Sequence, residues 1–205
     1  MSVDQLPELR SDDPRLAEIF AVRRSLDGWT VEEYEKLSGR VSRVEYVEGR
    51  LELLVAASIR HQRIVTAILS VLFDAILKPG HGEVFGQNTG LATRPRHFRE
   101  PDVTVVLSEH AGRLSEQRAL YADLVVEVIS PDDRRRDLIT KRDEYAAAGI
   151  PEYWIADPDD GSLTILVLEG GAYREAIKAT AGTVASATLD GVEVDIDETI
   201  GQFLN

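Results

Sequence analysis

Residues 124–156, LVVEVISPDDRRRDLITKRDEYAAAGIPEYWIA, decide the fold of this chain. The run Leu124–Ile129 is almost wholly apolar, which is typical of a strand that is buried on both faces. A Ser-Pro pair ends the run, two acids follow where a helix N-terminus favours them, and Gly149 gives a helix stop signal. Glu152–Ala156 predicts a second strand. A strand, a crossover helix and a strand together predict two parallel neighbours in one sheet.

Patterns outward from this unit predict the remaining sheet and its helices. Apolar residues at helical spacing between Ser58 and Pro79 predict a long amphipathic helix. A capping box at Thr30–Glu33 predicts a helix over Val31–Leu37, and Glu48-Gly49 predicts a hairpin turn between Arg43–Val47 and Arg50–Val55. Other predicted elements are a short helix after Asp13-Pro14, strands at Glu83–Gln87, Asp102–Leu107, Leu163–Leu168, Tyr173–Lys178 and Val192–Ile196, and a closing helix at Asp197–Phe203. This order predicts an α/β (α+β) fold, with a mixed central β-sheet flanked by helices and an N-terminal helix and hairpin extension.

Composition narrows the classes of protein that this sequence can represent. The 205 residues fit one domain at ~100–200 residues per domain, and 43% apolar content argues against wholesale disorder. With no cysteine, the chain has no disulfide, thiolate zinc site or cysteine nucleophile. No apolar run reaches the ~20 residues of a membrane span, and the first ten residues lack a signal-peptide core, so we expect a cytoplasmic protein. The net charge of −13 argues against non-specific binding to nucleic acid.

Two carboxylates stand out because each belongs to an apolar strand. Glu127 interrupts the run from Leu124 to Ile129, and a buried acid there is costly unless it is paired or binds a metal ion. Asp102 begins another apolar strand. Two carboxylates on neighbouring strands can hold a hard divalent cation such as Mg²⁺, and such an ion activates water and polarises phosphoryl oxygens.

Lys141 is expected beside Glu127. Three strand steps of ~3.3 Å, roughly 10 Å, separate Glu127 from the end of its strand. Eight helical steps of ~1.5 Å, about 12 Å, lead from Asp133 to Lys141, so a helix folded back on its strand brings Lys141 level with Glu127. The ammonium could then stabilise charge on a phosphate or orient an attacking water.

Several motifs together resemble the Uma2 family of restriction-endonuclease-like proteins, which belongs to the PD-(D/E)XK nuclease superfamily. The resemblance covers about Thr30 to Lys178. It rests on Arg99-Glu100-Pro101-Asp102-Val103, on Asp123–Pro131, on Arg136-Asp137 to Lys141, on Tyr145–Trp154, and further on Glu45–Leu51 and His61. It implies a restriction-endonuclease-like core at about residues 30–178 of a single domain, with an extension at 1–29 and a strand and short helix at 179–205.

The resemblance also implies Mg²⁺- or Mn²⁺-dependent cleavage of phosphodiester bonds in nucleic acid, DNA rather than RNA. Asp102 and Glu127 would be the metal ligands, with a carbonyl from Val128. The superfamily's usual lysine lies two residues after the glutamate, where this chain has Ile129, and in this family it has moved to the next helix, at Lys141. Two accessory residues are implied: Glu48 would act on the metal through water, and His61 would contact phosphate or shuttle a proton.

Three basic clusters adjoin these residues: residues 134–142, residues 94–99, and the pair Arg60 and Arg63. They predict a basic rim that binds phosphates weakly and locally on an otherwise acidic protein.

Other interpretations stay open. Asp102 could simply bond a turn, Glu127 could pair with an arginine, and Asp137 with Lys141 could form an ordinary surface ion pair. At the level of function, the missing lysine at position 129 and the acidic surface favour an inactive nuclease-fold scaffold, and hydrolysis of a small phosphoester is a third reading. Exposed strands such as Leu163–Leu168 could pair two chains in a homodimer.

Overall fold

The computed structural model of the chain describes residues 28–38, 44–54, 57–130 and 134–204. Its first half comprises α2 (Val31–Ser38), β1 (Val44–Val47), β2 (Arg50–Leu53), α3 (Ile59–Leu72), the π-helical turn η2 (Phe73–Leu77), β3 (Gly82–Phe85), β4 (Gly90–Arg94), β5 (His97–Arg99), β6 (Val103–Leu107) and the 3₁₀ helix η3 (Ser108–Arg113). Its second half comprises β7 (Arg118–Ala119), β8 (Leu124–Val128), the π-helical segment η4 (Arg136–Lys141), α4 (Arg142–Ala147), β9 (Glu152–Asp157), β10 (Ser162–Glu169), β11 (Ala172–Ala179), β12 (Thr183–Ala185), β13 (Glu193–Asp195), α5 (Ile196–Thr199) and η5 (Gly201–Phe203).

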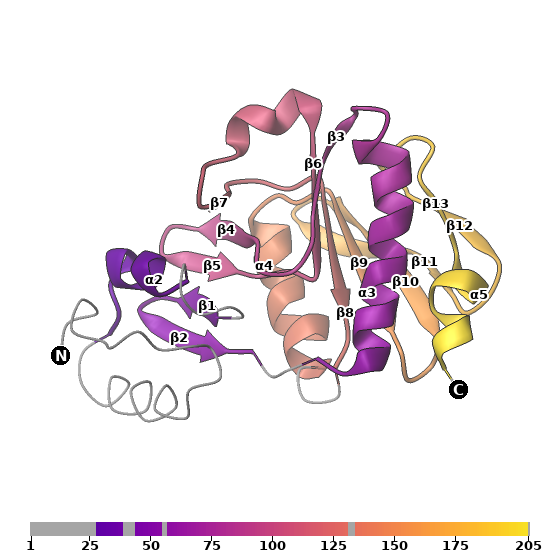
Figure 1. Cartoon of the computed structure of the whole chain (residues 1–205), viewed down its shortest axis with the longest axis horizontal. Coiled ribbons are helices and arrows are strands. Elements are labelled where there is room, and N and C mark those ends of the chain that lie inside the picture. Colours follow the sequence, from indigo (N-terminus) through magenta and orange to yellow (C-terminus); the bar gives the residue numbers. More distant parts are fainter. Residues whose placement is uncertain (1–27, 39–43, 55–56, 131–133, 205) are drawn as a thin grey trace.

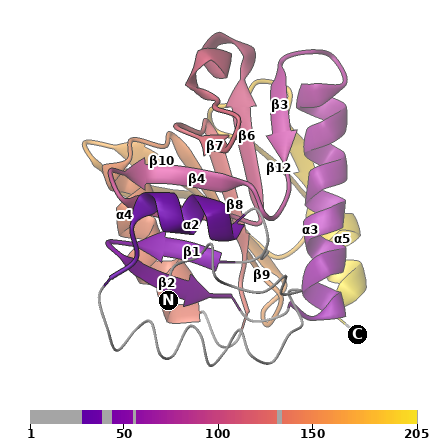
Figure 2. The same ribbon diagram turned by 60° about the vertical axis from the view of Figure 1, so that its left-hand side comes forward.

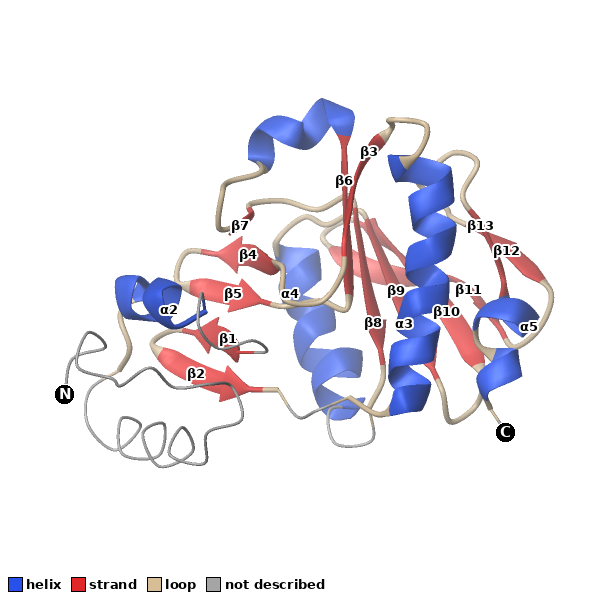
Figure 3. Ribbon diagram, in the orientation of Figure 1, coloured by secondary structure: helices blue, strands red, loops and turns tan. Residues whose placement is uncertain are grey.

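A six-stranded mixed sheet forms the centre of the fold, as the sequence predicts. Its strand order is β11-β10-β9-β8-β6-β3. The strands β8 and β9 are parallel, with Glu127 opposite Ile155, whereas the other neighbours in this sheet are antiparallel. The predicted strand–helix–strand unit is therefore confirmed, and the helices lie against the sheet (Figures 1 and 3).

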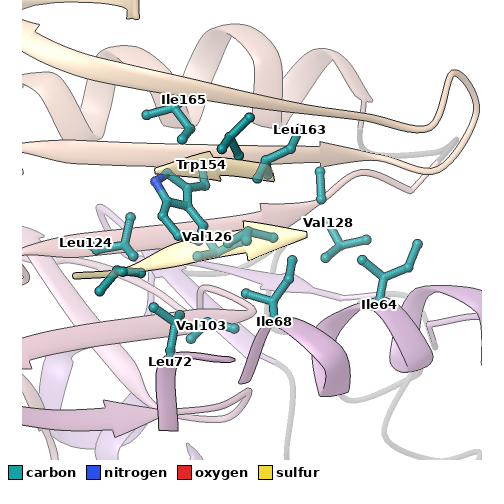
Figure 4. Packing of buried hydrophobic residues seen from close by; sticks show 14 of the residues in the cluster. Ile64, Ile68, Leu72, Val103, Leu124, Val126, Val128, Trp154, Leu163 and Ile165 are labelled. Atoms are coloured by element: carbon teal, nitrogen blue, oxygen red, sulfur yellow. The ribbon is translucent and has the colours of Figure 1, made fainter. Parts of the chain in front are cut away.

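Alternation along the strands gives the central sheet two buried faces. On one face, Val126 and Val128 of β8 and Trp154 of β9 pack against Ile64 and Ile68 of α3 (Figure 4). On the other face, apolar residues of the same strands pack against α4; this cluster includes Val125, Tyr153, Ile155, Tyr145 and Ala146. Because Glu127 alternates with Val126 and Val128, its side chain lies on the α4 face.

A smaller sheet, β2-β1-β5-β4-β7, lies beside α2 (Figure 2). The hairpin turn forms at Glu48 and Gly49, which both have positive φ, as a tight two-residue hairpin requires. Tyr34 of α2 stacks on Phe98 of β5, and the Arg118 guanidinium lies 3.9 Å from the Phe98 ring centre. The predicted hairpin, β1 and β2, belongs to this smaller sheet.

Several elements differ from the expectation. The strands β4, β5, β7 and β12 were not predicted; β4 and β5 fall in a stretch whose arginines suggest a basic surface instead. Leu163–Leu168 is not an exposed strand, because β10 is paired on both sides, with β9 and β11; the proposed route to a homodimer through it is wrong. The predicted helix after Asp13-Pro14 and the start of the crossover helix at Asp132 or Asp133 lie outside the described residues.

No helix within the described ranges is long and apolar enough to cross a membrane.

Candidate functional site

Glu127 meets the crossover helix, as its place in β8 predicts. Its Oε1 atom accepts hydrogen bonds from Lys141 Nζ and from the Tyr145 hydroxyl, both at 2.7 Å. All three side chains are buried. Within the described parts of the chain, Glu127 Oε2 has no hydrogen-bond partner, so this oxygen is available to a further donor or cation.

Lys141 reaches Glu127 because η4 and α4 fold back over β8. The π-helical segment η4 carries both Asp137 and Lys141, and π-helical turns often occur at functional sites. Lys141 Nζ also lies 3.4 Å from Asp137 Oδ1 and 3.4 Å from Glu45 Oε1. The lysine side chain is only 3% exposed, so the pair with Asp137 is a buried contact and not the ordinary surface ion pair.

Asp102 lies immediately before β6, next to the strand that carries Glu127. The pairing of Val103 with Val126, continued by one residue, places Asp102 opposite Glu127. Asp102 Oδ2 accepts the amide N–H of Val128 at 2.8 Å, which fixes the carboxylate beside β8. The two acids that the sequence singles out are therefore brought together at the ends of adjacent strands.

His61 joins this pair from the opposite face of the sheet. Ser58 caps α3 by accepting the amide N–H of His61, so the imidazole lies in the first turn of the helix. His61 Nε2 lies 3.1 Å from Asp102 Oδ1. Its Nδ1 is buried without a hydrogen-bond partner among the described residues.

Gln87 and Glu45 complete the cluster and were not assigned a role from the sequence. Gln87 Nε2 donates to Asp102 Oδ1 at 2.5 Å. Glu45 is fully buried in β1 and lies between Lys141 and Arg99. Its signal in the sequence is the same as that of Glu127, an acid between the apolar residues Val44 and Tyr46, whereas no pattern marks Gln87.

Glu48 does not join the cluster. It lies in the exposed turn between β1 and β2, where its carboxylate pairs with Arg94. The structure therefore places Glu48 apart from the cluster, and its accessory role stays a prediction; Glu45, three residues earlier and buried, is the hairpin acid that faces Lys141.

The charges of the cluster are unbalanced. Glu45, Asp102, Glu127 and Asp137 lie around the ammonium of Lys141, and another nearby cation, Arg99, is shared by Glu45 with Glu52 and Glu144, so acids exceed bases. Burial raises the pKa of Glu127 to about 8, with the charges of Asp137 and Asp102 also raising it and that of Lys141 opposing. Burial alone would lower the pKa of Lys141, but the three acids nearest to it raise it above its ordinary value.

The pKa values of Asp102 and Glu45 are lowered, whereas that of Glu127 is raised. Burial raises the pKa of Asp102, but the hydrogen bond and charge of His61 and the amide of Val128 bring it below its usual value. For Glu45 the charges of Lys141 and Arg99 likewise outweigh burial and lower the pKa. Two of the acids therefore remain ionised at neutral pH while Glu127 holds a proton more readily.

The donor set fits a hard divalent cation. Across the described residues, no three side chains among histidine, cysteine, aspartate and glutamate are arranged to hold a metal ion. Magnesium, however, keeps several waters and needs only one or two carboxylates. Asp102, Glu127 and an excess of buried negative charge supply those carboxylates and the electrostatic attraction, so the residues present fit Mg²⁺ or Mn²⁺.

The expected basic rim is largely neutralised within the chain. Arg99 is buried among Glu45, Glu52 and Glu144. Arg134 pairs with Asp157 at 2.6 Å, and Arg60 lies 3.4 Å from Asp159. Among the arginines of the predicted rim, Arg63, Arg96 and Arg135 are exposed and form no ion pair with an acid of the described residues, so they are free to meet phosphate.

Comparison with known proteins identifies the family. The family model of Uma2, described as "Putative restriction endonuclease", matches residues 31–197, which is most of the chain. The chain belongs to the Uma2 family. The matched span contains Glu45, His61, Asp102, Glu127 and Lys141. No curated protein matches the chain.

Among solved structures, the Uma2 chain is similar to the crystal structure of a "putative nuclease belonging to DUF820 from Anabaena variabilis ATCC 29413". The two share 16% sequence identity and superpose with a TM-score of 0.64, over 79% of this chain and 91% of that one. At this level of identity the likeness shows a shared fold. It confirms the nuclease-like fold that the resemblance implies.

Proposed function

We propose that this Uma2 protein is a divalent-metal-dependent nuclease that hydrolyses phosphodiester bonds of nucleic acid, with DNA as the expected substrate. The observation that carries the proposal is the meeting of Asp102 and Glu127 at the ends of two adjacent strands, inside a cluster where acids exceed bases. Family membership supports the same reaction class.

Asp102 and Glu127 would hold Mg²⁺ or Mn²⁺, with the main-chain carbonyl of Val128 as a further ligand. Such an ion, when bound, polarises a phosphoryl oxygen and lowers the pKa of coordinated water. The chain's own contribution is to hold the two carboxylates still: Val128 and His61 each fix one oxygen of Asp102, and Tyr145 fixes Oε1 of Glu127.

Lys141 would supply fixed positive charge next to the reacting phosphate. Its raised pKa keeps the side chain protonated, so it orients or stabilises an anionic group and does not accept a proton. Its stem is held by the helix, and its ammonium is directed at Glu127.

One observation favours the alternative, a nuclease-fold scaffold without activity. Lys141 is buried and engaged by three carboxylates, and most arginines around the site are paired with acids. In such a protein the ammonium would act as a permanent counter-charge for Glu127, and neither metal nor phosphate would be needed.

An assay on several nucleic acids distinguishes these functions. Single-stranded DNA, duplex DNA and RNA are incubated with the native chain in Mn²⁺, in Mg²⁺ and in EDTA, beside Asp102→Ala and Glu48→Gln. We expect Mn²⁺-dependent cleavage of DNA by the native chain and Glu48→Gln, and none by Asp102→Ala. Equal cleavage by Asp102→Ala, or cleavage in EDTA, would contradict the proposal.

Two further arms separate the remaining readings. Cleavage of a small phosphodiester but of no nucleic acid would support a hydrolase of small phosphoesters. No cleavage of any substrate, together with no Mn²⁺ binding, would support the scaffold.

A further inference from the structure

Glu45 is a buried carboxylate that has no role in the proposed metal site so far. Its side chain is fully buried in β1 of the smaller sheet. Burying a carboxylate is costly unless it is paired and hydrogen-bonded, because the ion loses its hydration. The contacts made by its two oxygens therefore show what holds it there.

Each oxygen of Glu45 contacts a different part of the site. Oε2 accepts from Arg99 Nη1 at 2.7 Å. Oε1 accepts the amide N–H of Glu100 at 3.1 Å and lies 3.4 Å from Lys141 Nζ. Since Glu100 is two residues before Asp102, one carboxylate touches both the lysine and the segment that leads into the first proposed metal ligand.

Arg99 holds Glu45 in place, and two other acids hold Arg99 itself. Glu144 of α4 binds the guanidinium through two hydrogen bonds, to Nε at 2.7 Å and to Nη2 at 2.8 Å. Glu52 of β2 accepts from Nη1 at 2.7 Å. Arg99 therefore ties the hairpin to α4 and presents Nη1 to Glu45 in a fixed direction.

Glu45 and Asp137 contact the same ammonium but constrain it differently. Asp137 is four residues before Lys141 on the same helical segment, so it moves with the lysine. Glu45 lies on a different element and also accepts the amide of Glu100, so it fixes the ammonium relative to the segment that leads into Asp102.

We propose that Glu45 is a positioning residue for Lys141, and that Arg99 is the anchor that directs Glu45 toward it. This inference rests on the proposed nuclease function for its catalytic consequence, whereas the positioning of the lysine is a property of the chain itself.

Glu52 offers a matched control. Both glutamates accept from Arg99 Nη1 at 2.7 Å, but only Glu45 is also within reach of Lys141. Glu45→Gln and Glu52→Gln each remove one carboxylate from Arg99, so a role confined to the Arg99 cluster affects both, and a positioning role separates them.

The decisive readout is the reactivity of the Lys141 amine, measured on the folded chain by acetylation and peptide mass spectrometry. We expect Lys141 to be acetylated several-fold faster in Glu45→Gln than in the native chain, with Glu52→Gln unchanged. In the nuclease assay at saturating Mn²⁺, Glu45→Gln should lower kcat about 10- to 100-fold with KM unchanged, as misplacement of a reacting group does.

Equal acetylation in the native chain and both variants would overturn the inference. Loss of cleavage alone does not enter this decision: if the native chain cleaves nothing, the nuclease proposal fails while the acetylation comparison still tests the positioning. If Glu45→Gln does not fold, Glu45→Asp is measured against Glu52→Asp, because it keeps the charge and withdraws the carboxylate from Lys141. Faster acetylation in Glu45→Asp alone is then expected, and equal rates overturn the inference.

Discussion

Glu127 and Glu152 are buried acids on neighbouring parallel strands, yet their surroundings differ in kind. Glu152, in β9, accepts hydrogen bonds at both oxygens from neutral donors: the Trp154 indole, the Ser186 hydroxyl, and the amide and hydroxyl of Thr188. No lysine, arginine or histidine of the described residues pairs with it. Glu127 has donors at one oxygen only, and it lies among other charges.

The difference teaches how to separate a structural from a functional carboxylate. A saturated shell of neutral donors fixes the loop at Ser186–Leu189 to the sheet, and it leaves no lone pair for a ligand. A carboxylate with one unoccupied oxygen, in a cluster of excess acid, is poised to take a cation instead. We therefore propose that burial serves stability in Glu152 and metal binding in Glu127.

The largest expected effect separates the two acids by activity. Glu127→Gln should lower Mn²⁺-dependent DNA cleavage by at least about 100-fold, because it removes a charged ligand and leaves the shape. Glu152→Gln should leave the rate per folded molecule unchanged. The measurement is single-turnover cleavage with both variants at equal folded concentration, and a similar loss in both would erase the distinction.

For stability, in contrast to activity, we expect the larger effect from Glu152→Gln. In Glu152→Gln an NH₂ group replaces one of the two accepting oxygens and faces the same N–H and O–H donors. The substitution should therefore lower the unfolding free energy by about 2–4 kcal/mol. Glu127→Gln should change stability by less than about 2 kcal/mol, since Glu45 and Asp137 still neutralise Lys141. Urea titration of both variants checks this; greater destabilisation by Glu127→Gln would contradict it.

A third acid sharpens the comparison through pH. Burial raises the pKa of Glu144, but His97 and Arg99 together lower it from 4.5 to about 2. A carboxyl whose pKa is lower in the folded chain stabilises it above the unfolded pKa, and this stability is lost as pH falls from about 4.5 toward 2.

The native chain should therefore lose stability across that window, and Glu144→Gln should lose less of it. Urea midpoints measured at several acidic pH values test the difference. Parallel curves for the native chain and Glu144→Gln would show that Glu144 is not stabilised by its cationic neighbours.

The smallest expected effect concerns the helix cap at Ser58, which positions His61. Ser58→Ala removes the oxygen that accepts the His61 amide, and loss of such a cap costs about 1 kcal/mol. Ser70→Ala, at an exposed position within the same helix, is the control and should not destabilise the chain. Equal unfolding free energies for the two variants would show that the cap adds nothing.

Local patterns made much of the fold predictable. The unbroken apolar run of β8, the Glu48-Gly49 turn and the amphipathic period of α3 each have one dominant physical reading, and the structure follows them. The strands β4 and β5 could not be predicted, since their residues alternate weakly and Arg99 is buried only because three acids from other elements surround it.

The site was predictable where chemistry and burial coincided, and not elsewhere. Glu127 and Lys141 lie on one strand–helix unit, so spacing alone brings them together. Gln87 contacts Asp102 through tertiary structure, which no local pattern encodes. The arginines suggested a basic rim because the sequence lists their charges without showing the acids that neutralise them.

The most direct test of the account is Mn²⁺ binding measured by isothermal titration calorimetry on the native chain, Asp102→Ala, Glu127→Gln and Glu152→Gln. We predict one Mn²⁺ site in the native chain and in Glu152→Gln, and loss of that site in the other two. Binding that survives in both Asp102→Ala and Glu127→Gln, or that is absent from the native chain, would contradict the claim that these two carboxylates share a cation.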